Sequence, residues 1–360
     1  MKQGIFWFSG IFLLAVICFL PAPALAHVPV FEGDGKSPKT VFQIEDPSKS
    51  RALYGELTSG DFRYYSFKME KGERIVLGLI IPVEQGNQGF TPNLILIGPG
   101  LADEEKVPER LEVPKGYGAK VLFYNFPESP VYEGFIPSAF YSLCHLDIKA
   151  PESGIYYAAV GVMPELNVTE GCTIQEKSMQ EKEIQRDGNY GLIFGYKETF
   201  TLKEWISVPL SQIKIYRWEG QSLFLIFTPL ALTLAAGLLA IFFKREAVSG
   251  FNPARFSGIL AGLFFLGTGM SYIFQMFFSL SKSSYSSEVF ITLFLICASI
   301  GLGVIAIVLS LKDESYGTGS ARKRLYFSGL GLAGLLFWAG FFIGPLLAFE
   351  ATILPWRRKG

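Results

Sequence analysis

Four long apolar runs occupy the second half of the chain. They cover residues 223–243, 256–280, 289–311 and 325–349, and none of them contains Asp, Glu, Lys, Arg or His. Each run is long enough for the roughly 20 residues that cross the hydrocarbon core as a helix. The pattern therefore predicts a C-terminal α-helical transmembrane bundle of about four helices, followed by a basic tail at residues 350–360.

The N-terminus carries a shorter apolar run with different flanks. Lys2 precedes apolar residues 5–20, and Ala24-Leu25-Ala26 follows them. A basic start, an apolar stretch of this length and an A-x-A ending are typical of a secretory signal peptide. We expect residues 1–26 to be cleaved, with an uncleaved signal anchor as the alternative. Either interpretation places residues 27–198 outside the cytoplasm.

Residues 40–196 have the composition that is typical of short strands joined by turns. Short β-branched and aromatic runs alternate with Gly, Pro, Asn and Asp, and no long helical period intervenes. Lys71-Gly72 and Pro151-Glu152-Ser153-Gly154 are turn signals between such runs. The pattern predicts an all-β, antiparallel sandwich domain.

Five short motifs of this region occur in the order of a known domain family. The motifs are Asp61-Phe62-Arg63-Tyr64-Tyr65-Ser66-Phe67, Lys71-Gly72-Glu73-Arg74-Ile75, Asn93-Leu94-Ile95-Leu96-Ile97-Gly98-Pro99-Gly100, Ala150-Pro151-Glu152-Ser153-Gly154-Ile155-Tyr156-Tyr157 and Gly188-Asn189-Tyr190-Gly191-Leu192. With them, residues 50–196 resemble the pre-peptidase C-terminal domain, with insertions at residues 101–140 and 163–187. The resemblance implies a jelly-roll-like β-sandwich ectodomain and a noncatalytic binding or stabilising role.

Residues 199–222 connect the two parts and combine aromatic with charged side chains. Trp205, Tyr216 and Trp218 are examples, and amphipathic aromatics of this kind prefer the membrane interface. We interpret the segment as a juxtamembrane collar, with Pro209 interrupting any helix there. A final strand followed by a linker is the alternative.

The charge distribution agrees with this division of the chain. The net charge is zero, but residues 27–219 hold 20 Lys or Arg against 27 Asp or Glu, whereas residues 221–360 hold 11 against 5. An acidic outer domain argues against nucleic acid as a partner, and basic connections next to spans face the cytoplasm. We predict a multi-pass cell-membrane protein with an extracytoplasmic N-terminal domain. One feature disagrees: an even number of spans also places Arg357, Arg358 and Lys359 outside.

The composition of the predicted spans indicates helix–helix packing and argues against a role in ion transport. They hold no ionisable residue, which argues against a pump or an ion-coupled transporter. Small residues spaced by four let helix backbones approach closely, within the bundle or between protomers. The lipid bilayer is thus the predicted partner, with self-association or other membrane subunits as further alternatives. The spacings are Gly258-x-x-x-Gly262, Ser299-x-x-x-Gly303 and Gly340-x-x-x-Gly344.

The sequence contains no motif of an enzyme and predicts no cofactor other than copper. G-x-S-x-G, H-E-x-x-H and C-x-x-C are absent. Cleavage after Ala26 would make His27 the mature N-terminal residue, whose amino group and imidazole can chelate copper together, as in the histidine-brace proteins that it resembles. His145, the only other histidine, is the candidate second ligand. A surface His27 and a strand-borne His145 without metal form the alternative.

Two covalent features are predicted in residues 27–198. Cys144 and Cys172 are its only cysteines. A disulfide between them would close a loop of about 29 residues and stabilise the domain by roughly 3–4 kcal/mol, with two free thiols as the alternative. Asn167-Val168-Thr169 is a sequon for N-glycosylation at Asn167.

These observations favour one function and leave two alternatives. The leading hypothesis is a noncatalytic, membrane-anchored extracytoplasmic binding or interaction module for an unknown surface ligand, with contacts through aromatic side chains of residues 123–141. The first alternative is an extracytoplasmic copper-binding protein that uses His27 and His145. The second is an accessory subunit of a membrane transport or signalling complex.

Overall fold

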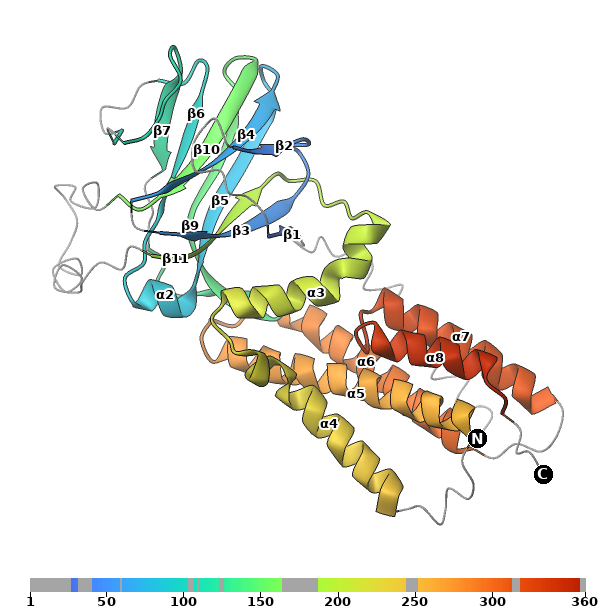
Figure 1. Cartoon of the computed structure of the whole chain (residues 1–360). Helices are drawn as coiled ribbons and strands as arrows, with labels where there is room; N and C mark the ends of the chain where they lie inside the picture. Colours follow the sequence, from blue (N-terminus) through green and yellow to red (C-terminus); the bar gives the residue numbers. More distant parts are fainter. Residues whose placement is uncertain are drawn as a thin grey trace.

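The computed structural model consists of a β-rich N-terminal part and a helical C-terminal part (Figure 1). It describes residues 27–31, 41–58, 60–102, 107–108, 110–122, 126–163, 187–243, 252–312 and 318–356. The predicted signal peptide at residues 1–26 lies outside the described residues.

The described strands form two sheets that pack face to face. Sheet A has the strand order β1-β3-β11-β5-β9-β8, and sheet B has the order β2-β4-β10-β6-β7. The strands of sheet A are β1 (Val28–Val30), β3 (Arg51–Leu57), β5 (Arg74–Pro82), β8 (Val131–Glu133), β9 (Ser138–Lys149) and β11 (Gly188–Phe194). Those of sheet B are β2 (Phe42–Ile44), β4 (Phe62–Met69), β6 (Asn93–Gly98), β7 (Gly118–Leu122) and β10 (Gly154–Gly161). The arrangement confirms the predicted all-β, jelly-roll-like sandwich.

The core of the sandwich is built from every second side chain of each strand. Leu53 of β3 and Leu192 of β11 are fully buried in it. The Phe67 ring of β4 meets the Phe194 ring of β11 edge-on, with 4.7 Å between centroids. The hydroxyls of Tyr65 and Tyr190 hydrogen-bond to each other at 2.6 Å, so these buried polar groups satisfy one another. We call this side of sheet A its inner face.

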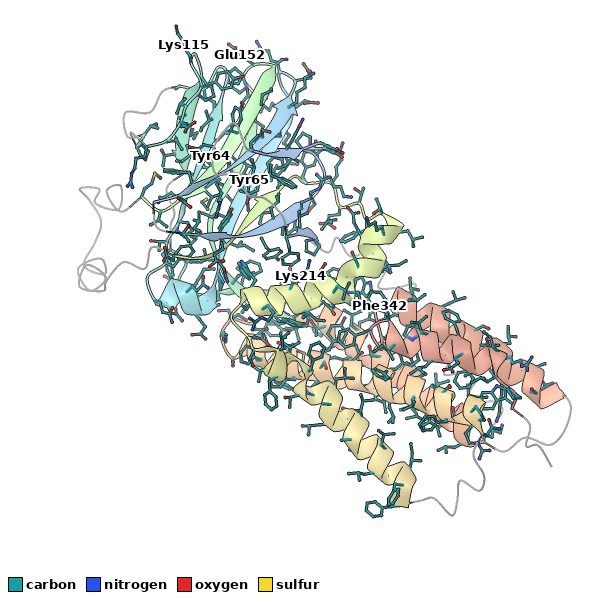
Figure 2. All side chains as sticks on the ribbon, in the orientation of Figure 1. Tyr64, Tyr65, Lys115, Glu152, Lys214 and Phe342 are labelled. Carbon is teal, nitrogen blue, oxygen red and sulfur yellow. The ribbon has the colours of Figure 1, made fainter. Side chains whose placement is uncertain are left out.

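The alternate side chains of sheet A point away from sheet B and form its outer face. Ala52, Tyr54, Ile80 and Ile193 belong to this face, each next in sequence to a residue of the core. The helix α3 (Leu202–Trp218) lies against it, between the sandwich and the remaining helices (Figure 1). Figure 2 shows Lys214 of α3 within the band of side chains that joins the two parts of the molecule.

Both ends of α3 form hydrogen bonds with sheet A or with residues next to its strands. Near its start, Lys49 Nζ donates to both carboxylate oxygens of Glu204 at 2.7 Å. At its end, Trp218 Nε1 donates to the Tyr190 carbonyl at 3.1 Å, and the Trp218 ring meets the Tyr54 ring edge-on at 5.0 Å between centroids. The contacts hold α3 on the outer face, so Trp218 is buried inside the protein.

The prediction that Pro209 interrupts any helix in this segment is wrong, because α3 continues through it. The first turn of α3 is closed by a capping box between Thr201 and Glu204. Pro209 cannot donate to the carbonyl of Trp205, four residues earlier, and a proline at such a position bends a helix. Figure 1 shows α3 bending along its length. The helix therefore continues through Pro209, but the Trp205 carbonyl needs another hydrogen-bond donor.

In the part of the chain that the structure describes, three helices after α3 are long and apolar enough to cross a membrane. They are α4 (Leu223–Phe243), α5 (Pro253–Leu280) and α6 (Val289–Leu311). These helices agree with the first three predicted spans, and α5 begins three residues earlier than predicted. The chain is therefore a membrane protein by the length and composition of its helices.

Small residues bring α5 and α6 together within the chain. A Cβ added to Gly262 of α5 would lie 2.8 Å from the Gly303 carbonyl oxygen of α6. A Cβ added to Gly258 would collide with Ser310 Oγ. Two of the three small-residue spacings therefore serve contacts inside the bundle, as close backbone packing in membranes requires.

The predicted fourth span at residues 325–349 is not one helix. The structure has α7 (Thr318–Leu336) and α8 (Ile343–Ile353), with a turn between them. Trp338 and Phe341 have positive φ values of 54° and 51° in this turn, and Gly340 has 73°, conformations that stop a right-handed helix. The third small-residue spacing, at Gly340, thus belongs to a turn.

The break between α7 and α8 returns the chain to the end of the bundle from which α7 starts. Trp356, after α8, stacks on the Phe327 ring at 5.3 Å between centroids, and Lys323 Nζ lies 4.8 Å from the Trp356 ring centroid. Pro345 falls in the first turn of α8, where a missing N–H costs no helical hydrogen bond. The two helices form a hairpin (Figure 1), so Trp356 lies at the same end of the bundle as Lys323.

Candidate ligand cavity between the sandwich and the membrane helices

A cavity of about 450 Å³ lies where sheet A, α3 and the membrane helices meet. Its volume falls within the range of roughly 300–1,000 Å³ that is typical of small-molecule sites. The strands contribute Ala52, Ile80 and Ile193, α3 contributes Trp205 and Val208, α6 contributes Phe294 and Leu295, and the end of α7 with the following turn contributes Leu336, Phe337 and Trp338. Neither half of the molecule forms this cavity by itself.

Strand register explains why the outer face of sheet A is hollow at this place. Pro29, Ala52, Ile193 and Gly78 are register partners in one row across four strands. Ala52 lines the cavity and is small, so its outward side leaves space that a larger residue would fill. Burial of both faces also explains why these strands hold apolar residues at consecutive positions.

The β8–β9 hairpin of the sandwich contacts the helix bundle. Tyr132 and Thr292 share a hydrogen bond at 2.7 Å, and Thr292 Oγ1 donates to the Gly134 carbonyl at 2.6 Å. The Gly134 N–H donates to Glu288 Oε2 at 3.0 Å. Since Thr292 belongs to α6 and Glu288 precedes it, these bonds lock the hairpin to the start of that helix.

Tyr132 and Tyr141 are buried, although both fall in the segment predicted to offer surface aromatics for a partner. Tyr132 packs with the apolar side chains of the membrane helices, and Tyr141 belongs to the core of the sandwich. The prediction of exposed contacts is therefore wrong for these two residues. The first part of the segment, residues 123–125, lies outside the described residues.

Glu133 brings a carboxylate to the wall of the cavity. Its Oε1 accepts the N–H of Phe135 at 2.9 Å, and its Oε2 accepts the N–H of Ile136 at 3.1 Å. Burial raises the pKa of Glu133 to about 8, and the negative charges of Glu288 and Glu219 act in the same direction. The two backbone donors hold the carboxyl group in place even though its surroundings disfavour charge.

Glu219 begins a second polar network beside the cavity. Its Oε1 accepts the Ala139 N–H at 2.8 Å and its Oε2 accepts Gln221 Nε2 at 3.0 Å. Gln221 and Gln275 donate to each other's amide oxygens, at 2.9 and 2.8 Å. Burial raises the pKa of Glu219 to about 7. Gln275 of α5 thus has a structural role, because it ties the membrane helix to the end of α3.

Trp338 supplies the donor that Pro209 takes away. Trp338 Nε1 donates to the Trp205 carbonyl at 2.9 Å, the carbonyl that an ordinary residue at position 209 would have bonded. The two indole rings also pack at 4.6 Å between centroids. Gly340 N–H donates to Thr268 Oγ1 of α5 at 2.8 Å, which fixes the turn from its other side. Figure 2 shows Phe342, in the same turn, beside the end of the bundle that faces α3.

The two histidines of the copper hypothesis lie on opposite parts of sheet A. His27 precedes β1 and lines the cavity, where its Nδ1 lies 2.5 Å from Ser50 Oγ. His145 is exposed on β9, and β3, β11 and β5 separate the two strands. Four strand spacings amount to about 19 Å, so the structure does not bring these imidazoles together. The described residues also contain no group of three or more His, Cys, Asp or Glu that could hold a metal ion.

The other predicted site residues fall partly outside the described residues. Cys144 is half-buried on β9, where burial raises the pKa of its thiol to about 12. Cys172 and Asn167 lie outside the described residues, so the disulfide and the glycan stay predictions. Glu133 and Trp338 were missed as site residues because neither belongs to a sequence motif. The sequence feature related to Trp338 is Pro209, because a proline inside a helix leaves the carbonyl of Trp205 in need of another donor.

Comparisons with known proteins give a limited result. No family model and no curated protein matches the sequence. Among solved structures, the pre-peptidase C-terminal domain of a collagenase from Bacillus anthracis has 15% identity and a TM-score of 0.21, covering 43% of this chain and 95% of that one. A periplasmic inhibitor of g-type lysozyme from Salmonella Typhimurium has 18% identity and a TM-score of 0.20, covering 44% and 100%. The first is a domain of the kind that the sequence motifs resemble. Scores this low carry no weight for fold or function, and the fold rests on the strand order and register.

Proposed function

We propose that this chain is a membrane-anchored, extracytoplasmic binding protein that takes a largely apolar ligand into the cavity between its sandwich and its membrane helices. The observation that carries the proposal is the cavity of about 450 Å³ that both halves close together. Its wall consists mainly of aliphatic and aromatic side chains with a few polar groups, which is the usual composition of a small-molecule site. The ligand would be held at the level where the sandwich meets the bilayer.

The orientation of the protein in the membrane is part of the proposal. The pattern of residues 1–26 favours export of the sandwich. Lys323 and Trp356 lie together at one end of the α7–α8 hairpin, and Arg357, Arg358 and Lys359 directly follow Trp356 in the sequence. Lys312 and Lys323 lie together at the end of the bundle away from the sandwich, which agrees with a cytoplasmic position for that end.

The proposal is tested with the full chain in nanodiscs and ω-bromododecanol as the probe. Bromine quenches indole fluorescence only on close approach, and Trp205 and Trp338 line the cavity. We expect quenching that saturates with probe concentration. Ala52→Phe and Ile193→Phe, which fill the cavity from two different strands, should abolish the saturable part.

The matched control is Ile155→Phe, which adds similar bulk to an exposed position on β10 of sheet B. Quenching in this variant should equal that of the wild type. Quenching that rises linearly with probe in all four proteins would mean that the probe reaches the indoles only through the bilayer, and would contradict the proposal.

A further inference from the structure

The exposed face of α3 combines apolar and basic side chains and lies apart from the cavity. Tyr216 and Trp218 are buried, so other residues of this helix meet its surroundings. Leu202, Ile206 and Leu210 are 75%, 37% and 53% exposed. Side chains four residues apart lie on one face of a helix, so these three form an apolar stripe. Such a stripe favours contact with a membrane or a partner over contact with water.

α3 lies at the depth where the hydrocarbon core of a bilayer ends. Counted from Arg255 near the start of α5, the roughly 20 residues that cross the core end near Gln275. Gln212 Nε2 of α3 donates to the Tyr272 hydroxyl of α5 at 2.7 Å, and Gln275 bonds with Gln221, just after α3. Since α3 lies between the sandwich and the other helices (Figure 1), it occupies the level of the bilayer interface.

The apolar edge of the exposed face adjoins the membrane helices. At 3.6 residues per turn, Leu202 and Ile206 are the exposed positions next to Tyr216 around the helix. Tyr216 is buried in a cluster that includes Tyr272 and Met276 of α5. Leu202 and Ile206 therefore lie on the side of α3 that is turned toward the bilayer.

The basic edge of the same face adjoins the sandwich. Lys203 and Lys214 are exposed, and by the same geometry they lie next to Trp218, which bonds to sheet A. The Lys214 ammonium lies 5.0 Å from the centroid of the Phe31 ring, directly after β1. Glu204, the one acidic residue of α3, is already bonded to a lysine of the sandwich. This edge thus presents positive charge to its surroundings.

From this arrangement we propose that the exposed face of α3 rests on the bilayer interface and binds lipids with an anionic phosphate head group. Leu202 and Ile206 contact the upper part of the acyl chains, while Lys203 and Lys214 reach the phosphates above them. Charge complementarity favours an anionic lipid over a second copy of the chain, because two identical faces would bring like charges together.

The test uses the full-length protein in phosphatidylcholine nanodiscs that contain a small fraction of a photoactivatable lipid. The two probes are phosphatidylglycerol and phosphatidylcholine, each with a diazirine at the same acyl carbon close to the ester, and mass spectrometry locates the adducts. We expect adducts in residues 202–210. Phosphatidylglycerol should label them about fivefold more strongly, the factor that one basic residue near an anionic surface contributes.

The role of charge is tested by Lys203→Gln combined with Lys214→Gln, which should bring the two lipids to similar labelling of α3. The matched control is Lys71→Gln combined with Lys115→Gln, which removes two charges from exposed positions of the sandwich. Figure 2 shows Lys115 at the end of the sandwich away from the helices. The control variant should keep the difference between the lipids.

The role of the apolar edge is tested by Leu202→Gln combined with Ile206→Gln, which should lower the labelling of α3 by both lipids. Equal labelling by the two lipids in the wild type, or a difference that persists without Lys203 and Lys214, would overturn the inference. Adducts in the membrane helices with none in α3 would also overturn it, because another protein or a second copy would then cover this face.

Discussion

The two faces of sheet A are covered by different parts of the molecule and differ in their polar content. The inner face meets sheet B in an apolar core, in which the hydroxyls of Tyr65 and Tyr190 hydrogen-bond to each other. The outer face meets α3 and the membrane helices, and holds Glu133, Glu219 and a cavity. A core that serves stability alone has no need for buried carboxylates, which are costly without a partner. This contrast supports the proposal that the ligand binds at the outer face.

The largest effect should come from truncating the inner face. Phe194→Ala removes a fully buried ring that packs on Phe67, and should lower the free energy of unfolding by about 3–5 kcal/mol. Ile193→Ala, one residue earlier, should cost clearly less, because Ile193 already borders a cavity. Thermal unfolding of the solubilised protein, followed by tryptophan fluorescence, measures both. Equal losses of unfolding free energy in the two variants would show that the inner and outer faces are packed equally well.

The second effect is a pH dependence that belongs to the outer face. Glu133 and Glu219 have folded-state pKa values of about 8 and about 7, above their ordinary value of 4.5. The folded state therefore binds more protons than the unfolded state, and stability falls as pH rises through these values. Between about pH 6.5 and 8.5 we expect a loss on the order of 2 kcal/mol.

Glu133→Gln should flatten this pH profile, whereas Glu152→Gln, at an exposed position, should leave it unchanged. The window avoids the region below about pH 6.5, where His27 acts oppositely because its folded pKa is lowered to about 4. A profile of the Glu133 variant identical to that of the wild type would show that this carboxyl does not carry the effect.

A smaller effect is expected from the amide pair that joins α3 to α5. Gln275→Leu leaves the Gln221 amide oxygen without its donor in a buried position, at a cost of about 1–2 kcal/mol. The double variant Gln221→Leu with Gln275→Leu should recover part of the loss, because no half-satisfied pair remains. Unfolding in detergent measures the cycle, and strict additivity would argue against a direct interaction.

The smallest effect concerns the bond between the α7–α8 turn and α3. Trp338→Phe removes the donor to the Trp205 carbonyl and should cost about 1 kcal/mol. In a Pro209→Ala background, the alanine N–H can bond this carbonyl, so the same Trp338 substitution should cost less. If the cost were the same in both backgrounds, the indole would contribute through ring packing alone.

The order of strand-like runs and turn residues was enough to predict the sandwich, and the length of the apolar runs was enough to predict the first three spans. The hydropathy of residues 325–349 did not reveal their structure, because one long helix and a broken helical hairpin have the same hydropathy. The turn depends on positive φ values at Trp338, Phe341 and Gly340. Two features indicated that the fourth span was not a single helix: the basic residues 357–359, and an apolar run from residue 325 to residue 356 that is long for one helix.

The cavity could not be predicted, because it depends on which strands lie side by side. Sequence alone does not reveal that three strands separate β1 from β9, and so it could not test the pairing of His27 with His145. Glu133 appears in sequence as an ordinary charged residue near aromatics. Its role follows only when the β8–β9 hairpin docks on α6 and buries it.

Hydrogen–deuterium exchange with and without ω-bromododecanol tests most directly whether sheet A and the membrane helices hold a ligand jointly. We expect the ligand to slow exchange both in β3 and in the turn between α7 and α8, with no change in β4 and β10 of sheet B. The cavity-filled Ala52→Phe protein should show no response. Protection confined to the membrane helices, with β3 unaffected, would contradict the claim.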